Sequence, residues 1–407
     1  MLSLVSLFTG AGGLDLGMEA AGYDVRAAVE FDDDACETLR ANRNWPVIEG
    51  NIHDVTSEEI LDKAKAKRGE IALLVGGPPC QPFSKSGYWR LGDTKRLEDP
   101  RADTLTAYLR VLRDLQPKAF LLENVEGLIY KGKDEGLQHL RHQVAHINRT
   151  EGTNYSFERK VLNAADYGVP QIRERVFIVG ARDGKRFTFP KETHIDPDEH
   201  GADMFSKFRE PWMNCWDAIG DLNDTPRVGL AVGGQWGDLL PSIPEGNNYL
   251  WHTDRGGGLR LFGWRRRYWS FLLKLGKNKP SWTVQAQPGS AVGPFHWKSR
   301  RLSMRELCRI QTFPDDFQIT GTRTEVQRQL GNAVPSLLAE VLGRAMREQL
   351  LDSPPETEFP ELRVTRRLPL PPPEPITEVP EKYHCFIGDH PAHPGTGKGN
   401  MVYGLTG

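Results

Sequence analysis

The chain has 407 residues, enough for two or three domains, and its 38% hydrophobic and 26% charged residues are typical of a soluble globular protein. A net charge of −2 excludes a polycation, so any nucleic-acid surface must be a local patch. No apolar run approaches the roughly 20 residues of a membrane helix, and the N-terminus lacks the basic region of a signal peptide. The five cysteines are scattered and form no CxxC pair, which favours a reducing, cytoplasmic setting and disfavours a disulfide framework or a metal site.

Residues 2–180 alternate strand-like apolar runs with helical stretches. The expected strands are Leu2–Phe8, Tyr23–Val29, Ile71–Val75, Ala119–Leu122 and Arg175–Val179, and the expected helices include Leu14–Ala21 and Thr104–Leu115. This alternation is typical of βαβ units. It predicts an α/β fold with a mostly parallel sheet that helices cover.

The rest of the chain divides into three further parts after a first domain of residues 1–185. Residues 186–298 are rich in Gly, Pro and Trp and show little periodicity, which predicts a smaller, irregular domain. Helical periodicity is found again in residues 299–350, which predicts an amphipathic helix at Leu302–Ile310 and a second helix that starts near Pro335. The Pro-rich residues 351–407 are expected to be a tail without a fold of its own, either disordered or docked on the core.

A glycine-rich turn, Phe8–Gly17, joins the first strand to the first helix. Its glycines let the backbone turn tightly and let a ligand approach the helix N-terminus. Glu30 ends the second strand, where a carboxylate can accept hydrogen bonds from ribose hydroxyls. A dinucleotide and S-adenosylmethionine compete for this pattern, and a purely structural turn is the third alternative. The glycine spacing differs from GxGxxG, and no basic cluster is present to hold a pyrophosphate, which disfavours the dinucleotide.

A proline-rich loop with one cysteine, Gly76-Gly77-Pro78-Pro79-Cys80-Gln81-Pro82-Phe83-Ser84, follows the third expected strand. Proline locks φ and removes a backbone donor, so this loop has few conformations. A rigid loop at the carboxyl end of a strand suits a nucleophile, which makes Cys80 a candidate. For an isolated Pro-Cys pair, an inert buried cysteine would be the better interpretation.

Further polar residues are expected at the same edge of the sheet. Glu123 ends the run Leu121–Val125 and therefore lies near Cys80 and Glu30, where open α/β sheets bind ligands. Gln171, Arg173 and Arg175 alternate along an extended segment and so share one face. Taken alone, a strand-end carboxylate is more often a capping or solvated group, and such alternation more often marks a half-exposed strand.

Together these motifs resemble those of the DNA cytosine-5 methyltransferase family. Six motifs occur in the family's order: the glycine-rich turn, the Pro-Cys loop, Glu123-Asn124-Val125, Gln171-x-Arg173-x-Arg175, the helix segment Arg305–Pro314 and Gly331-Asn332-Ala333-Val334-Pro335. The resemblance covers residues 1–350 except the middle block. It implies a Rossmann-like, S-adenosylmethionine-dependent catalytic domain that residues 299–350 return to complete, and a target-recognition domain at residues 186–298.

For catalysis, the resemblance implies that the Cys80 thiolate adds to carbon 6 of cytosine, so that carbon 5 attacks the methyl group of S-adenosylmethionine and S-adenosylhomocysteine is released. Glu123 is expected to bind ring nitrogen 3 and the exocyclic amine, with a pKa raised by burial. Arg175 is expected to bind the carbonyl oxygen at ring position 2. Arg173 is expected to organise the loop or contact phosphate, and both arginines favour the thiolate.

The resemblance also implies a set of cofactor-binding residues. Phe8 and Phe31 would pack on the adenine, Glu30 would bind the ribose, and Asn332 with the glycine-rich backbone would hold the methionine part. The full set expected at the cofactor is Phe8, Gly10, Ala11, Gly12, Gly13, Leu14, Glu30, Phe31, Asn51, Ile52, Pro79, Asn332 and Ala333. Asn51 departs from the family pattern, which usually has an acid there to accept from the adenine amine. Either the Asn51 oxygen accepts this bond or Asp54 substitutes for it.

Double-stranded DNA is the expected partner, and a cognate restriction or defence protein is a further one. Because a base inside a duplex is unreachable, the resemblance implies that the target cytosine is flipped out. The residues expected at the DNA are Gln81, Ser84 and Lys85 in the loop after Cys80, and Arg265, Arg266 and Arg267 among aromatic residues of the recognition region. A solvated surface is the alternative for both groups.

Three rival functions remain. A transfer-RNA methyltransferase shares the catalytic motifs, but its characteristic Cys-Phe-Thr element is absent from residues 186–298. A non-catalytic DNA-binding relative does not explain the intact set of Cys80, Glu123, Arg173 and Arg175. A nicotinamide- or flavin-dependent oxidoreductase predicts a bound chromophore and leaves the Pro-Cys loop unexplained.

Overall fold

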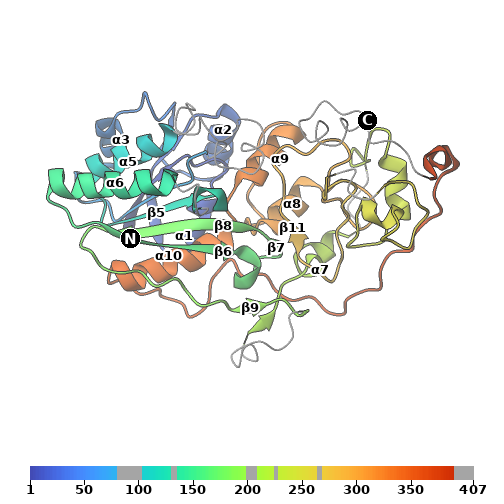
Figure 1. The fold of residues 1–407 in the computed structure, drawn as a ribbon. Coiled ribbons are helices and arrows are strands. Elements are labelled where there is room, and N and C mark those ends of the chain that lie inside the picture. The colour runs from blue at the N-terminus through green and yellow to red at the C-terminus, as the bar shows by residue number, and fades with distance from the viewer. Residues whose placement is uncertain (80–102, 130–134, 199–208, 224–227, 264–267, 389–407) are drawn as a thin grey trace.

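A sheet of seven strands forms the centre of the N-terminal lobe (Figure 1). The computed structural model describes residues 1–79, 103–129, 135–198, 209–223, 228–263 and 268–388. The strands are β1 (Leu2–Leu7), β2 (Tyr23–Glu30), β3 (Val47–Glu49), β4 (Leu73–Gly76), β5 (Ala119–Asn124), β6 (Ser156–Asn163) and β8 (Glu174–Ala181). Their order is β3-β2-β1-β4-β5-β8-β6, and only β8 runs antiparallel to its neighbours β5 and β6. The predicted α/β fold with a mostly parallel sheet is therefore confirmed.

Helices cover both faces of this sheet. The helices of this lobe are α1 (Gly13–Ala20), α2 (Asp33–Asn42), α3 (Ser57–Ala64), α5 (Asp103–Leu115), α6 (Glu135–Glu151), α8 (Met304–Ile310), α9 (Arg323–Asn332) and α10 (Ser336–Leu350). Successive strand residues point to opposite faces, so Leu4 belongs to the core with α1 and α10, whereas Val5 belongs to the core with α3, α5 and α6. Because both faces are buried, the inner strands are continuous apolar runs, which is why the sequence predicts them.

The last long helix, α10, packs directly on α1 near the start of the chain. A Cβ added at Gly17 would lie 2.2 Å from the carbonyl oxygen of Ser336, so the two backbones are in contact. The Tyr23 hydroxyl donates a hydrogen bond to the carbonyl of Gly343 at 3.2 Å. The helix expected near Pro335 is present, with Pro335 as its N-cap residue. Residues after 299 thus return to the sheet formed by the first third of the chain.

The described residues 228–263 and 268–298 form a second lobe, here called the distal lobe. Its regular elements are short, such as η7 (Gly237–Ser242) and η8 (Tyr249–His252). An aromatic-rich cluster forms its core. β11 (Ser281–Trp282) pairs with β7 (Gln171–Ile172), and this pairing connects the distal lobe to the segment that leads into β8. β9 (His194–Ile195), β10 (Glu210–Pro211) and α7 (Cys215–Ile219) lie between the lobes in sequence.

Two strands of the central sheet, β3 and β6, are not among the strands that the sequence predicts. β6 is an edge strand whose residues are mostly half-buried, so its sequence SFERKVLN contains no apolar run. The sequence also predicts a tail without a fold of its own. Its residues 352–388 follow the lower edge of the molecule to the far end of the distal lobe, where η9 (Glu381–Phe386) forms (Figure 1). In the described part of the chain, residues 352–388 therefore lie against both lobes.

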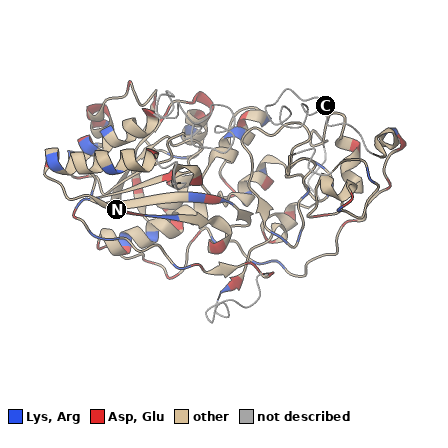
Figure 2. Cartoon of the chain, viewed as in Figure 1, with Lys and Arg blue, Asp and Glu red and all other residues tan. Residues whose placement is uncertain are grey.

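Charged residues of both signs are interspersed over both lobes in the described chain (Figure 2). This distribution agrees with the small net charge of −2. No helix in the described ranges combines the length and apolar character needed to span a membrane.

Candidate active site

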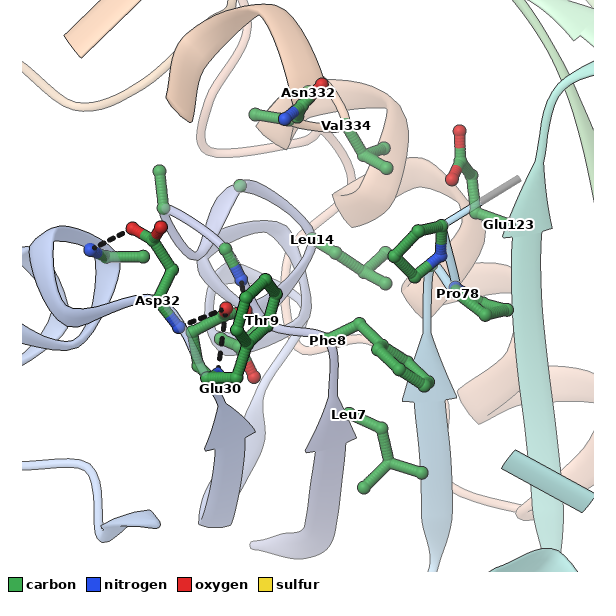
Figure 3. Close-up of a pocket in the computed structure, with 18 of the residues that line it drawn as sticks. Leu7, Phe8, Thr9, Leu14, Glu30, Asp32, Pro78, Glu123, Asn332 and Val334 are labelled. Carbon is green, nitrogen blue, oxygen red and sulfur yellow. Dashed lines mark hydrogen bonds between the residues drawn. The ribbon is translucent and has the colours of Figure 1, made fainter. Parts of the chain in front are cut away.

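A cavity of about 860 Å³ lies at the carboxyl ends of β1, β2, β4 and β5. The strand order reverses between β1 and β4, and open α/β sheets bind ligands at such a point. The volume is within the range of about 300–1,000 Å³ that is usual for small-molecule sites. Figure 3 shows Glu30 and Asp32 on one side of the cavity, Pro78 and Glu123 on the other, and Asn332 and Val334 from the returning chain.

Glycines bring the first helix and the returning chain to this cavity. Gly12 is the N-cap of α1 and has a φ of +81°, a left-handed conformation that residues with a Cβ rarely adopt. A Cβ at Gly13 would lie 2.3 Å from the carbonyl oxygen of Val334, so only glycine allows this approach. The start of α1 consequently lines the cavity through Gly13 and Leu14. Backbone N–H groups at a helix N-terminus favour an anionic ligand group such as a carboxylate.

Glu30 organises the backbone on one wall of the cavity. Its Oε2 accepts a hydrogen bond from the N–H of Gly10 at 2.7 Å, and its Oε1 accepts from the N–H groups of Phe31 and Asp32, both at 2.9 Å. Burial raises the pKa of this carboxyl, and the three backbone hydrogen bonds oppose the shift. A carboxylate oxygen has room for two hydrogen bonds. Oε2 can therefore hold the glycine-rich turn and also accept from a ligand hydroxyl.

The next two residues present an aromatic face and an ion pair to the cavity. Phe31 lines it and remains 63% exposed, unusually open for a large apolar side chain. Asp32 caps α2 and pairs with Arg328 of α9, with 2.8 Å between Oδ2 and Nη1. The sequence analysis missed Asp32 and Arg328. No local signal connects them, because the pair joins an N-cap to a helix residue 296 positions later.

The departure from the family pattern at Asn51 is visible in the structure. Asn51 and Ile52 line the cavity, and Asp54 is absent from the described lining residues. The Asn51 side-chain oxygen accepts a hydrogen bond from the N–H of His53 at 3.1 Å. This oxygen is thus held in place and retains one acceptor position. The geometry favours Asn51 over Asp54 as the acceptor at this wall.

The opposite wall holds an ion pair between Glu123 and Arg175. Arg175 Nε lies 3.2 Å from Glu123 Oε1, and the two side chains are only 19% and 12% exposed. Burial raises the pKa of Glu123, whereas Arg175 and then Arg173 oppose the shift. A raised pKa favours the protonated form of this carboxyl, which is the form that can act as a proton donor.

Arg173 lies deeper and has unused donors. Its Nη2 donates to the carbonyl of Gly331 at 2.9 Å, directly beside Asn332. Its Nε and Nη1 are buried and have no hydrogen-bond partner among the described residues. Burial lowers the pKa of this guanidinium, and Arg175 lowers it further. An uncompensated buried cation is costly, so the cavity is suited to an acceptor or an anion close to Arg173.

The segment before Cys80 is tied to this wall. Asn124 donates from Nδ2 to the carbonyl of Pro78 at 3.2 Å, and the Thr104 hydroxyl donates to the carbonyl of Pro79 at 3.3 Å. Pro79 lines the cavity. Cys80 itself lies outside the described residues.

Comparison with known proteins identifies the family. The sequence profile of C-5 cytosine-specific DNA methylases matches residues 2–348. The chain belongs to this family. Family membership confirms the resemblance found in the sequence and makes the protein a DNA cytosine-5 methyltransferase, an activity that depends on S-adenosylmethionine.

Relatives of this methyltransferase carry the names of type II modification enzymes. It is 44% identical over 377 residues to the type II methyltransferase M.SacI of Streptomyces achromogenes, an alignment that covers 86% of this chain and 95% of that protein. It is 33% identical over 341 residues to M.NgoFVII of Neisseria gonorrhoeae, covering 82% and 83% of the two chains. Identity to M.AquIA of a Picosynechococcus strain is 45%, over 56% of this chain and 92% of that protein.

Solved structures agree on the fold. The first is described as a DNA modification methyltransferase encoded within an E. coli prophage; it has a TM-score of 0.58 at 22% identity, covering 87% of this chain and all of that one. A Spodoptera frugiperda DNMT2 structure has a TM-score of 0.57 at 16% identity, covering 85% and 99%. At these identities the likeness concerns the fold alone.

The structure brings most of the sequence-predicted site residues together. Every residue expected at the cofactor lines the cavity except Gly12, which packs against Leu39 and Trp45. Glu123, Arg173 and Arg175 line the same cavity. Gln171 points away and hydrogen-bonds Gln311 and the N–H of Val284. The residues expected at the DNA, Gln81, Ser84, Lys85, Arg265, Arg266 and Arg267, lie outside the described residues, as does Cys80.

Proposed function

We propose that this protein methylates carbon 5 of a cytosine within a specific duplex DNA sequence, as the modification enzyme of a type II restriction-modification system. The observation that carries the proposal is a single cavity shared by two groups of residues. The glycine-rich turn, Glu30 and Phe31 line one side, and Glu123, Arg173, Arg175 and Pro79 line the other. Such a cavity holds a methyl donor and a pyrimidine next to each other. The names of the relatives support the modification role.

The residues of the first wall fit S-adenosylmethionine, which when bound supplies an electrophilic methyl group. The exposed ring of Phe31 offers a stacking surface for the adenine, and Glu30 Oε2 keeps an acceptor position for a ribose hydroxyl. The start of α1 provides N–H groups for the methionine carboxylate, with Asn332 and Ala333 beside it.

The residues of the second wall fit a cytosine that has been flipped out of the duplex. The Cys80 sulfur forms a bond to carbon 6, which makes carbon 5 nucleophilic enough to take the methyl group. A base then removes the carbon 5 proton, the bond between sulfur and carbon 6 breaks, and the electrons of the carbon–hydrogen bond restore the ring double bond. Glu123 protonates ring nitrogen 3, so that the ring can take up the electron pair that the thiolate adds at carbon 6, and Glu123 takes this proton back when the cysteine leaves.

The two arginines have different tasks in this scheme. Arg175 is held by Glu123 at 3.2 Å and binds the carbonyl oxygen at ring position 2. Arg173 lines the cavity, is fixed by the carbonyl of Gly331 at 2.9 Å, and keeps two buried donors without a partner among the described residues. Their positive charge lowers the cost of forming a thiolate at Cys80. The proposed DNA contacts come from two places. One is the loop after Cys80, with Gln81, Ser84 and Lys85. The other is the target-recognition region of residues 186–298, with the arginines at 265–267.

The deciding experiment is transfer of a radiolabelled methyl group from S-adenosylmethionine to unmethylated duplex DNA, with transfer RNA assayed in parallel. We expect label on DNA, none on RNA, and no label with Cys80→Ala, whereas DNA binding by this variant persists in a gel-shift assay. Bisulfite sequencing of the product then gives the target sequence. Label on RNA alone would establish the transfer-RNA methyltransferase instead, and undiminished transfer by Cys80→Ala would refute the role of the cysteine.

A further inference from the structure

Residues 352–388, here called the C-terminal strap, follow α10 and lie outside the matched family profile, which ends at residue 348. The strap leaves the sheet lobe, passes α7 and ends against the distal lobe (Figure 1). Along this path it contacts buried charged side chains in three successive parts of the fold. These three contacts are called the anchors.

The first anchor is on α10. Glu340 is fully buried, and its two carboxylate oxygens accept hydrogen bonds from the strap N–H groups of Glu361 at 2.6 Å and Leu362 at 2.8 Å. Arg344, one turn later, donates to the hydroxyl of Thr357 at 2.9 Å. A buried carboxylate needs such donors, because without them the loss of its hydration is not compensated. The strap thus supplies the hydrogen bonds that a buried charge of α10 requires.

The second anchor is on α7. Asp217 is fully buried; Arg366 Nη1 lies 3.1 Å from its Oδ2, and the N–H of Arg367 donates to its Oδ1 at 2.8 Å. The Arg367 side chain also pairs with Asp221 at 3.1 Å, and Asp221 pairs with Arg309 of α8 at 3.2 Å. The strap therefore connects α7 to the helix that follows the distal lobe.

The third anchor is within the distal lobe. Lys277 is buried and lies 2.7 Å from Glu245 and 3.0 Å from Glu374 of the strap, and it donates to the carbonyl of Pro372 at 2.9 Å. Farther along, Tyr383 is only 1% exposed and belongs to the core of the lobe. Its ring stacks on Trp236 with centroids 5.7 Å apart, and its hydroxyl donates to the carbonyl of Gln235 at 2.7 Å.

We infer that the C-terminal strap fixes the position of the distal lobe relative to the catalytic cavity, and thereby sets the affinity of the enzyme for duplex DNA. The inference rests on the proposed function, in which the distal lobe belongs to the region that reads the target. Because the anchors lie on α10, on α7 and in the distal lobe, loosening the strap leaves the lobes joined by fewer contacts. None of the anchor residues lines the cavity, so we expect loss of the second or third anchor to leave cofactor affinity unchanged.

The test uses the full chain with two strap variants, the double variant Arg366→Ala/Arg367→Ala at the second anchor and Tyr383→Ala at the third. We expect the KM for duplex DNA to rise roughly threefold to tenfold, whereas kcat changes less than about twofold. The dissociation constant of S-adenosylhomocysteine, measured by calorimetry, stays at the parent value. The matched control is Glu378→Ala, an exposed strap residue away from the anchors, which leaves all three quantities unchanged.

Hydrogen exchange gives a readout that does not depend on activity. In the absence of DNA, the strap variants should exchange the amides of η7 and η8 faster than the parent, whereas those of β1 and β4 keep the parent rate. If the parent transfers no methyl group to DNA but its strap variants show this faster exchange, the proposed function is refuted, whereas the role of the strap in holding the distal lobe stands. An active parent whose strap variants keep the DNA KM, or lose cofactor affinity in the same proportion, would overturn the inference.

Discussion

Asp15 offers a sharp test of how burial controls charge beside the cofactor cavity. It lies in the first turn of α1, is fully buried and lines the cavity. No hydrogen bond of normal geometry reaches its carboxylate oxygens from the described residues. Burial raises its pKa from 3.8 to about 7; the nearby Ser6 hydroxyl opposes the shift, and Glu19 and Glu30 add to it.

The sign of the pH effect follows from the raised pKa. Between about pH 4 and pH 7 the folded protein keeps a proton on Asp15 that the unfolded chain releases, so this residue makes stability fall as pH rises. The slope is at most about 1.4 kcal/mol per pH unit, which gives roughly 2–3 kcal/mol between pH 5 and pH 7. The amide introduced by Asp15→Asn cannot ionise. The variant should therefore gain stability relative to the parent by this amount as pH rises.

Urea unfolding at pH 5, 6, 7 and 8 measures the difference between the two proteins. All other titrating groups are shared and largely cancel in the difference, and Asp62→Asn serves as a control for the loss of one exposed carboxylate. A stability difference between parent and Asp15→Asn that stays constant across this range would refute the reasoning, because it would mean that Asp15 keeps the same protonation state in the folded and unfolded chains.

Three further perturbations test other parts of the structure. Glu123→Gln keeps the shape but removes the proton donor, so kcat should fall by roughly 10²–10⁴-fold in the methyl-transfer assay while the cofactor dissociation constant is kept. Gly13→Ala places a Cβ 2.3 Å from the Val334 carbonyl, which should cost about 1–3 kcal/mol in urea unfolding and weaken cofactor binding measured by calorimetry. In limited trypsin digestion followed by mass spectrometry, cleavage should be slow after Arg367 and Lys382, which the anchored strap holds, and early cleavage there would show that the strap is loose.

The sheet and the composition of the cavity could largely be predicted from sequence. The inner strands are buried on both faces and appear as apolar runs. The carboxyl ends of parallel strands lie at one edge of the sheet, which predicts Glu30 and Glu123 at the same edge. β6 could not be predicted, because an edge strand with half-buried residues has no apolar pattern. The pair Asp32–Arg328 and the three strap anchors could not be predicted from sequence either. Each of these contacts joins a buried charge to a segment far away in the sequence. No local sequence pattern indicates which two segments will meet.

The contact between α1 and α10 has a consequence for synthesis on the ribosome. The buried hydrogen bond from Tyr23 to Gly343 joins positions 320 residues apart. A nascent chain therefore carries the glycine-rich turn and the apolar stripe of α1 exposed until nearly all of it has emerged. Such exposed surface is a target for chaperones and aggregation. The cavity closes only when α9 and α10 arrive, so a ribosome that stalls before these helices yields a chain without methyl-transfer activity.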